Sequence, residues 1–467
     1  MIPLIFFLII VFFIYWGSRS SAKVQDDSSY LLANRKTSLL ALVATLVMTE
    51  FNTSTLLAFS GFGYTTGIWG LCLPLVFLVG LGFYTLTVAK KWKRFNAISV
   101  AELFSLRYGN GFGKFVSLLL IISMIGFSAT YVKSLIFLFQ PFVPELNSYV
   151  LSAGLVILVL LITLRGGLVS IIQTDLISFF ATMILLPMIF YFSYSGSEKG
   201  FMGLVDTFPT SSSENLPIRF IASLILITMF TYISAPWYGQ KIFAALDEKT
   251  AFKAVGISSI LVFIFYALPL LGVAFLKVNG VIGILPETAI PTIIKSYFPE
   301  WLVGFAFAIL FLIGATTLSG VWSALVTMIV GDFVLSKKGK IGKDYQGSIQ
   351  LTVIFAVLSW LIANLFVDSI LDKMILANIP IAAISFSLLA GFYWKRATTG
   401  GAILSTIAGI IWGMGCYIHL GESGGYTWFW AIYGIPLIFI GGIVGSYLFP
   451  KSKSEEILFV KFQARMK

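Results

Sequence analysis

Long apolar stretches recur along the whole chain, and short charged segments separate them. Windows of about 20 residues, the length that crosses a hydrocarbon core, fit at about 13 positions. They are residues 2–16, 38–64, 67–89, 115–138, 148–164, 168–194, 217–237, 255–276, 301–334, 348–367, 373–394, 399–418 and 428–449. Only 11% of residues are charged, against about 25% in a soluble domain. The sequence therefore predicts an all-α polytopic membrane protein.

The net charge of +11 is unevenly distributed. Lys and Arg cluster after the first, third, ninth and eleventh stretches and in the tail, which are all predicted to lie on one side. The other side has six of them: Lys133, Lys199, Arg219, Lys277, Lys295 and Lys373. The positive-inside rule predicts a cell-membrane protein with its N-terminus outside and its C-terminus in the cytoplasm. The charge thus indicates topology and contact with the lipid bilayer rather than nucleic-acid binding, and nothing implies an oligomer.

One predicted span contains a dense polar cluster. The sequence from 48 to 67 reads MTEFNTSTLLAFSGFGYTTG, and the cluster in it consists of Thr49, Glu50, Asn52, Thr53, Ser54 and Thr55. A carboxylate at mid-membrane costs roughly 3 kcal/mol on the mildest scale, and consecutive polar positions cannot share one helix face. A polar contact between helices is the plainer alternative. We expect instead an unwound segment near residues 48–54 that lines a binding site.

Two further segments support this interpretation. Residues 227–241, ITMFTYISAPWYGQK, contain Pro236 in or just after a span, which predicts a second break near 228–237. Residues 314–332 carry hydroxyls on one helix face, among them Thr316 and Ser319. Uncharged oxygens suit a Na⁺ ion that must be released again, although Ser and Thr also bond to their own helix. Two interrupted spans at matching places point to a site between inverted repeats.

Six motifs in sequence order resemble the sodium:solute symporter family, which includes sodium/glucose, proline, pantothenate and sialic acid carriers. They are YLLANR (30–35), SGFGYTTG (60–67), ISVAELFSLRYG (98–109), GGLVSIIQTD (166–175), GQKIFAALDEKTAFKA (239–254) and ATTLSGVWSALVTMIVGD (315–332). In the fifth motif, Lys241 stands in what resembles a loop, where the family usually has Arg. The last four spans match only in number and orientation.

The resemblance implies a five-plus-five inverted repeat with alternating access and broken first and sixth core helices. By position it implies a Na⁺ site with carbonyls from Met48, Phe51 and Ile313 and hydroxyls from Thr316 and Thr317. Asp175 falls on a family aspartate tied to ion binding or release; a helix-start acid is the simpler alternative. The expected solute contacts are Thr49, Glu50, Asn52, Thr53, Ser54 and Tyr232. The expected divisions are 1–37 (leading helix and loop), 38–194 and 195–394 (the two repeats), and 395–467 (two helices and tail).

The sequence therefore predicts Na⁺-coupled symport of a small polar solute. An amino acid or another zwitterionic or charged metabolite is favoured over a sugar, because the acidic and lysine positions of the sugar carriers have no counterpart here. Glu50 needs a partner, either a cation in transit or a protein group such as Lys133. Proton coupling through Glu50 or Asp175 remains an alternative, as does a transporter-like sensor. An enzyme is disfavoured because no paired His, metal set or nucleophile–base pair is visible.

Overall fold

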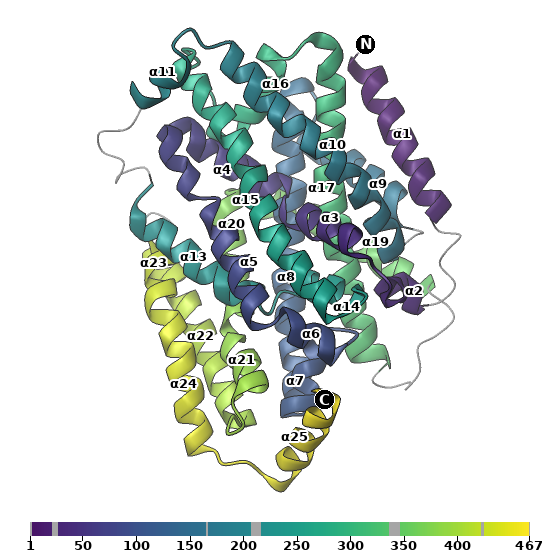
Figure 1. The fold of residues 1–467 in the computed structure, drawn as a ribbon, viewed down its shortest axis with the longest axis vertical. Helices are drawn as coiled ribbons and strands as arrows, with labels where there is room; N and C mark the ends of the chain where they lie inside the picture. Colours follow the sequence, from purple (N-terminus) through teal and green to yellow (C-terminus); the bar gives the residue numbers. More distant parts are fainter. Residues whose placement is uncertain are drawn as a thin grey trace.

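The computed structural model describes residues 2–20, 27–164, 167–206, 216–335, 346–421 and 425–466. Within these ranges the regular elements are helices, and one isolated bridge joins Thr37 to Ala245. Most of the helices run along the long axis of the molecule (Figure 1). The N-terminus lies at one end of this axis and helix α25 (Lys453–Met466) at the other. The predicted all-α membrane fold is confirmed.

The first half of the chain forms the helices that precede residue 207. They are α1 (Ile2–Ser20), α2 (Asp27–Leu32), α3 (Leu39–Glu50), α4 (Thr53–Thr66), α5 (Leu75–Thr87), α6 (Ala89–Phe95), α7 (Ala101–Tyr108), α8 (Asn110–Phe139), α9 (Ser148–Thr163), α10 (Gly167–Ser195) and α11 (Gly200–Asp206). Short 3₁₀ turns join several of them, such as η3 (Gly67–Cys72) after α4.

The second half forms the remaining helices. They are α13 (Ile218–Tyr232), α14 (Pro236–Ala244), α15 (Glu248–Val278), α16 (Ala289–Tyr297), α17 (Glu300–Met328), α19 (Gln346–Leu365), α20 (Ile370–Ala383), α21 (Ser385–Tyr393), α22 (Thr399–Leu420), α23 (Tyr426–Phe429), α24 (Ile435–Leu448) and α25. Helices α22 and α24 pack side by side near α13 and α20 (Figure 1).

Eight helical segments of the described chain are long and apolar enough to cross a membrane, and up to eleven are if each bent pair is one span. The shorter apolar helices Pro3–Trp16 and Ser148–Ile162 coincide with two more predicted spans. The count of thirteen crossings stays a prediction. Helix α17 is central, since 94% of its most apolar window is buried, against 33% for α19.

Both predicted breaks are present. The axis bends by 60° between α3 and α4 and by 48° between α13 and α14. A third bend, of 50°, lies between α5 and α6 and was not predicted from the sequence. Figure 1 shows α3 crossing the centre of the molecule, with α14 close to it.

The first break is stabilised by one tyrosine. Residues 51 and 52 leave the helix, and the Asn52 side chain caps α4 by accepting from the Thr55 amide at 2.8 Å. Tyr266 of α15 donates its hydroxyl to the Glu50 carbonyl at 2.7 Å, and the Asn52 amide donates to the same hydroxyl at 3.0 Å. Backbone groups that the break frees are thus satisfied inside the protein, as a membrane interior requires.

Candidate functional site

Glu50 lies at the end of α3, where the break turns its side chain toward α13 and α14, the second broken pair of helices. The carboxylate is buried and accepts hydrogen bonds from the phenols of Tyr232, on α13, and Tyr238, on α14, the latter at 2.8 Å. Its partners are therefore two tyrosines that flank the second break. Lys133, considered as a partner from the sequence, places its ammonium over the ring of Phe137 instead, 5.7 Å from the centroid.

A cavity of about 590 Å³, part of it open to solvent, adjoins this carboxylate. Its lining residues come from both broken pairs and from α5, α8 and α20: Glu50, Asn52, Thr55, Phe59, Val76, Phe77, Phe127, Tyr131, Leu224, Thr228, Tyr232, Trp237, Leu371, Met374, Ile375 and Asn378. Among these described residues Glu50 carries the one formal charge, and Lys, Arg and His are missing from the lining. Aromatic rings form much of the remaining wall.

The expected solute contacts fall into two groups. Glu50, Asn52 and Tyr232 line the cavity. Thr53 and Ser54 point toward α8 instead, where the Thr53 hydroxyl bonds to Ser134 at 2.6 Å and the Ser54 hydroxyl donates to the Thr130 carbonyl at 2.9 Å.

Thr49 also lies away from the cavity lining, and its hydroxyl donates to the Thr45 carbonyl at 2.7 Å. Part of the polar cluster thus does what the plainer sequence alternative proposed, and makes polar contacts between helices.

The expected ion ligands meet where α3 ends against α17. In an unbroken helix the Asn52 amide would bond to the Met48 carbonyl, but here it donates to Tyr266. The Thr317 hydroxyl is 2.9 Å from the Met48 carbonyl and 2.9 Å from the Ile313 carbonyl. The break therefore makes a backbone oxygen available beside a buried hydroxyl.

The remaining expected ligands lie close by. The Thr316 hydroxyl is 3.3 Å from the Ile313 carbonyl. Phe51 is the first non-helical residue of the break, and its ring packs against Phe265 and Tyr266. Carbonyl and hydroxyl oxygens without a nearby thiol or imidazole suit a hard cation such as Na⁺, so the residues present fit the expected ion.

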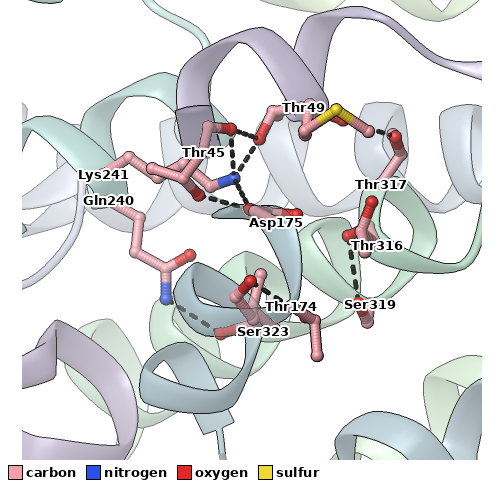
Figure 2. A network of polar contacts seen from close by, with 12 residues as sticks. Thr45, Thr49, Thr174, Asp175, Gln240, Lys241, Thr316, Thr317, Ser319 and Ser323 are labelled. Atoms are coloured by element: carbon pink, nitrogen blue, oxygen red, sulfur yellow. Dashed lines mark hydrogen bonds and ion pairs between the residues drawn. The ribbon is translucent and has the colours of Figure 1, made fainter. Parts of the chain in front are cut away.

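Asp175 lies in the same region, more than two turns inside α10, so it is not a helix-start acid. Its carboxylate accepts from the Thr45 hydroxyl and interacts with the Thr316 hydroxyl. The Lys241 ammonium is 3.1 Å from the same carboxylate. Figure 2 shows Lys241 pointing in from one side, with its nitrogen among Thr45, Thr49 and Asp175.

Lys241 was expected in a loop, and this prediction is wrong. It lies in the helix α14 and is 1% exposed. The neighbouring Gln240 is also buried, and its amide donates to Ser323 at 3.0 Å and Thr327 at 2.8 Å on α17. Pro236, predicted to lie in or just after a span, is the first residue of α14, because Pro is favoured in the first turn of a helix. The apolar run after Lys241, IFAA, was the available signal that the helix continues.

A second cavity lies next to the first, and both are lined by Leu371. It has about 1110 Å³ of free space, including space open to solvent. The charged residues among its described lining residues are Arg219 near the start of α13, Asp372 near the start of α20, and Glu287 in the 3₁₀ turn η5 (Pro286–Thr288).

Comparison with known proteins gives a consistent result. The model of the sodium:solute symporter family matches residues 30–409. The sodium/pantothenate symporter of Haemophilus influenzae is 24% identical over 466 aligned positions, which cover 91% of this chain and 90% of that protein. The resemblance drawn from the six motifs is confirmed over most of the chain.

Solved structures agree on the fold. A Na⁺-coupled sialic acid symporter, in a substrate-bound outward-open state, superposes with a TM-score of 0.81 at 18% identity and covers 97% of this chain and 98% of its own. A transporter of the nucleobase-cation-symport-1 family, in a closed conformation, gives a TM-score of 0.53 at 13% identity, with coverage of 92% and 98%.

Proposed function

The chain belongs to the sodium:solute symporter family, which makes it a multi-pass membrane transporter, not an enzyme, with Na⁺ as its coupling ion; from this premise we propose that its solute is a small zwitterionic or cationic metabolite. An amino acid is one such solute. The observation that carries the proposal is the Glu50 carboxylate beside a cavity whose described lining residues include no Lys, Arg or His.

The chemistry of the cavity disfavours two other solute classes. Pantothenate and sialic acid, which the similar transporters carry, are acids. In this cavity an acid would face Glu50, and the part of the lining that the structure describes has no lysine or arginine to balance its charge. A sugar needs many hydrogen-bond partners, whereas most of this wall is aromatic or aliphatic. An ammonium group, by contrast, gains from a carboxylate and from the faces of aromatic rings.

We further propose how Na⁺ and solute are coupled. The carbonyls of Met48, Phe51 and Ile313 and the hydroxyls of Thr316 and Thr317 hold the ion, and Asp175 acts on its route. Bound Na⁺ then fixes α3 against α17, and this holds Glu50 in place at the cavity. Ion binding thereby favours solute binding, and by linkage the solute favours the ion to the same degree.

The proposed architecture follows the same premise. Residues 38–194 and 195–394 form the two repeats, which rock against each other in alternating access. Residues 1–37 and 395–467 flank this core. The N-terminus faces outward and the C-terminus faces the cytoplasm, as the distribution of Lys and Arg suggests.

Uptake into proteoliposomes tests the proposal. Radiolabelled cationic, zwitterionic, anionic and sugar solutes are compared under an inward Na⁺ gradient, under a pH gradient without Na⁺, and under neither. We expect accumulation of a zwitterion or cation under the Na⁺ gradient alone. Accumulation of only an anion or a sugar would refute the proposed solute class. Accumulation driven by the pH gradient without Na⁺ would favour proton coupling instead.

A further inference from the structure

The Lys241 side chain is buried, and three oxygen atoms surround its ammonium group. Its ammonium donates to the Thr45 carbonyl at 2.8 Å, to the Thr49 hydroxyl, and to the Asp175 carboxylate at 3.1 Å. An ammonium has three hydrogens, and three oxygens from α3 and α10 receive them. Both side chains of the ion pair are almost fully buried, 2% exposed for Lys241 and 1% for Asp175.

These oxygens are also of the kind that bind a hard cation. A carboxylate, a carbonyl and a hydroxyl are typical ligands of such an ion. The set adjoins the proposed Na⁺ site, since Thr49 follows Met48 in α3 and Asp175 interacts with Thr316. Space is provided by Gly320 of α17, where an added Cβ would lie 4.0 Å from the Lys241 nitrogen. The oxygens of Thr45, Thr49 and Asp175 therefore have the chemistry and the position of a second ion site.

We propose that the Lys241 ammonium is a built-in cation, which permanently fills a second ion position formed by Thr45, Thr49 and Asp175, so that the transporter binds a single Na⁺. The charge of Asp175 is then already balanced before any ion arrives. A second mobile Na⁺ would have to enter beside an ammonium, at a distance where like charges repel strongly in a buried site.

A purely structural role is the competing explanation. The ion pair ties α14 to α10, and the contacts with Thr45 and Thr49 tie α14 to α3, so Lys241 also fixes the second broken pair against the first. A structural tie alone would affect protein yield and thermal stability when it is removed. It would not change the number of Na⁺ ions bound by the protein that remains folded.

Counting bound ions separates the two explanations. Isothermal titration calorimetry of Na⁺ into the purified protein, without solute, gives the number of sites directly. It does not depend on the solute class, so this proposal can fail while the proposed function stands. We expect one site in the wild type and in Lys241→Arg, which keeps a charge. We expect two sites in Lys241→Gln, where the bare Asp175 carboxylate and the vacated space accept an ion.

The double variant Lys241→Gln/Asp175→Asn is the matched control. It removes both charges, so we expect it to return to one site. All variants are titrated under the same conditions near neutral pH, so that the Lys241 ammonium keeps its charge in the wild type. Two Na⁺ sites in the wild type would overturn the proposal without any variant. Folded Lys241→Gln with one site would also overturn it, as would two sites in the double variant, because the extra ion would then not depend on Asp175.

Discussion

Replacing Glu50 with Gln removes one charge from the cavity and almost no volume. In the wild type, two phenols donate to the carboxylate, and the solute's ammonium is proposed to be its third partner. In the variant only the amide oxygen accepts, so one tyrosine must turn and accept from the amide nitrogen. We expect the protein to fold, because the phenols retain partners and the cost of burying a charge disappears.

The expected loss falls on solute binding. A hydrogen bond to a charged group is worth about 1.5–3 kcal/mol, against about 0.5–1.5 kcal/mol for a neutral one. The difference of about 1–2 kcal/mol corresponds to roughly a 5- to 30-fold rise in the solute concentration that half-saturates uptake. A solute ammonium held by the carboxylate and by ring faces would lose its one charged partner.

Uptake at saturating Na⁺ across a range of solute concentrations measures this. Tyr238→Phe is the matched control, because it removes a phenol from the same carboxylate and keeps the charge, while Tyr238 itself does not line the cavity. We expect a smaller rise in this control than in Glu50→Gln. If Glu50→Gln half-saturates at the wild-type concentration, the carboxylate does not contact the solute and the reasoning about its class is wrong.

Three further outcomes are expected. Thr317→Ala removes one proposed ion ligand and should raise the half-saturating Na⁺ concentration of uptake about tenfold, the equivalent of about 1.4 kcal/mol. The control Thr85→Ala removes a hydroxyl that is bonded within its own helix and should leave that concentration unchanged. Tyr266→Phe removes two hydrogen bonds at the first break and should lower stability by about 1–3 kcal/mol in thermal unfolding; an unchanged midpoint would show that the break does not need them. Gly113→Ala would place a methyl group 2.7 Å from the Ser105 backbone and should destabilise the packing of α7 on α8. Gly111→Ala, whose methyl group would meet no atom within 4 Å, should not. Equal thermal unfolding midpoints for the two variants would contradict this packing.

The spans and both main breaks were predictable from the sequence because their causes are local. Apolar length fixes where a helix crosses a membrane. The run from Thr49 to Ser54 cannot share one helix face, and Pro236 interrupts helical hydrogen bonding, so each break is visible in a short window. The bend between α5 and α6 contains no Pro, and the basic residues that follow it, 90–94, indicate the end of a span rather than a break within it.

The partners of the polar residues were not predictable, because they are distant in sequence. Glu50 and Tyr238 are 188 positions apart, and Lys241 and Asp175 are 66 apart. Tyr232 was assigned to the solute site, but its bond to Glu50 depends on how α13 packs. Lys241 was misplaced because its motif resembles a loop of the family, whereas its burial depends on the ion pair with Asp175 in another helix.

The most direct test of the central claim is the affinity of the purified protein for its solute, measured with and without Na⁺. Once uptake has identified a solute, its dissociation constant is measured in Na⁺ and in choline at equal ionic strength, and the Na⁺ affinity is measured with and without that solute. We expect Na⁺ to tighten solute binding and the solute to tighten Na⁺ binding by the same factor. Solute binding of equal affinity with and without Na⁺ would contradict coupling through the broken helix at Glu50.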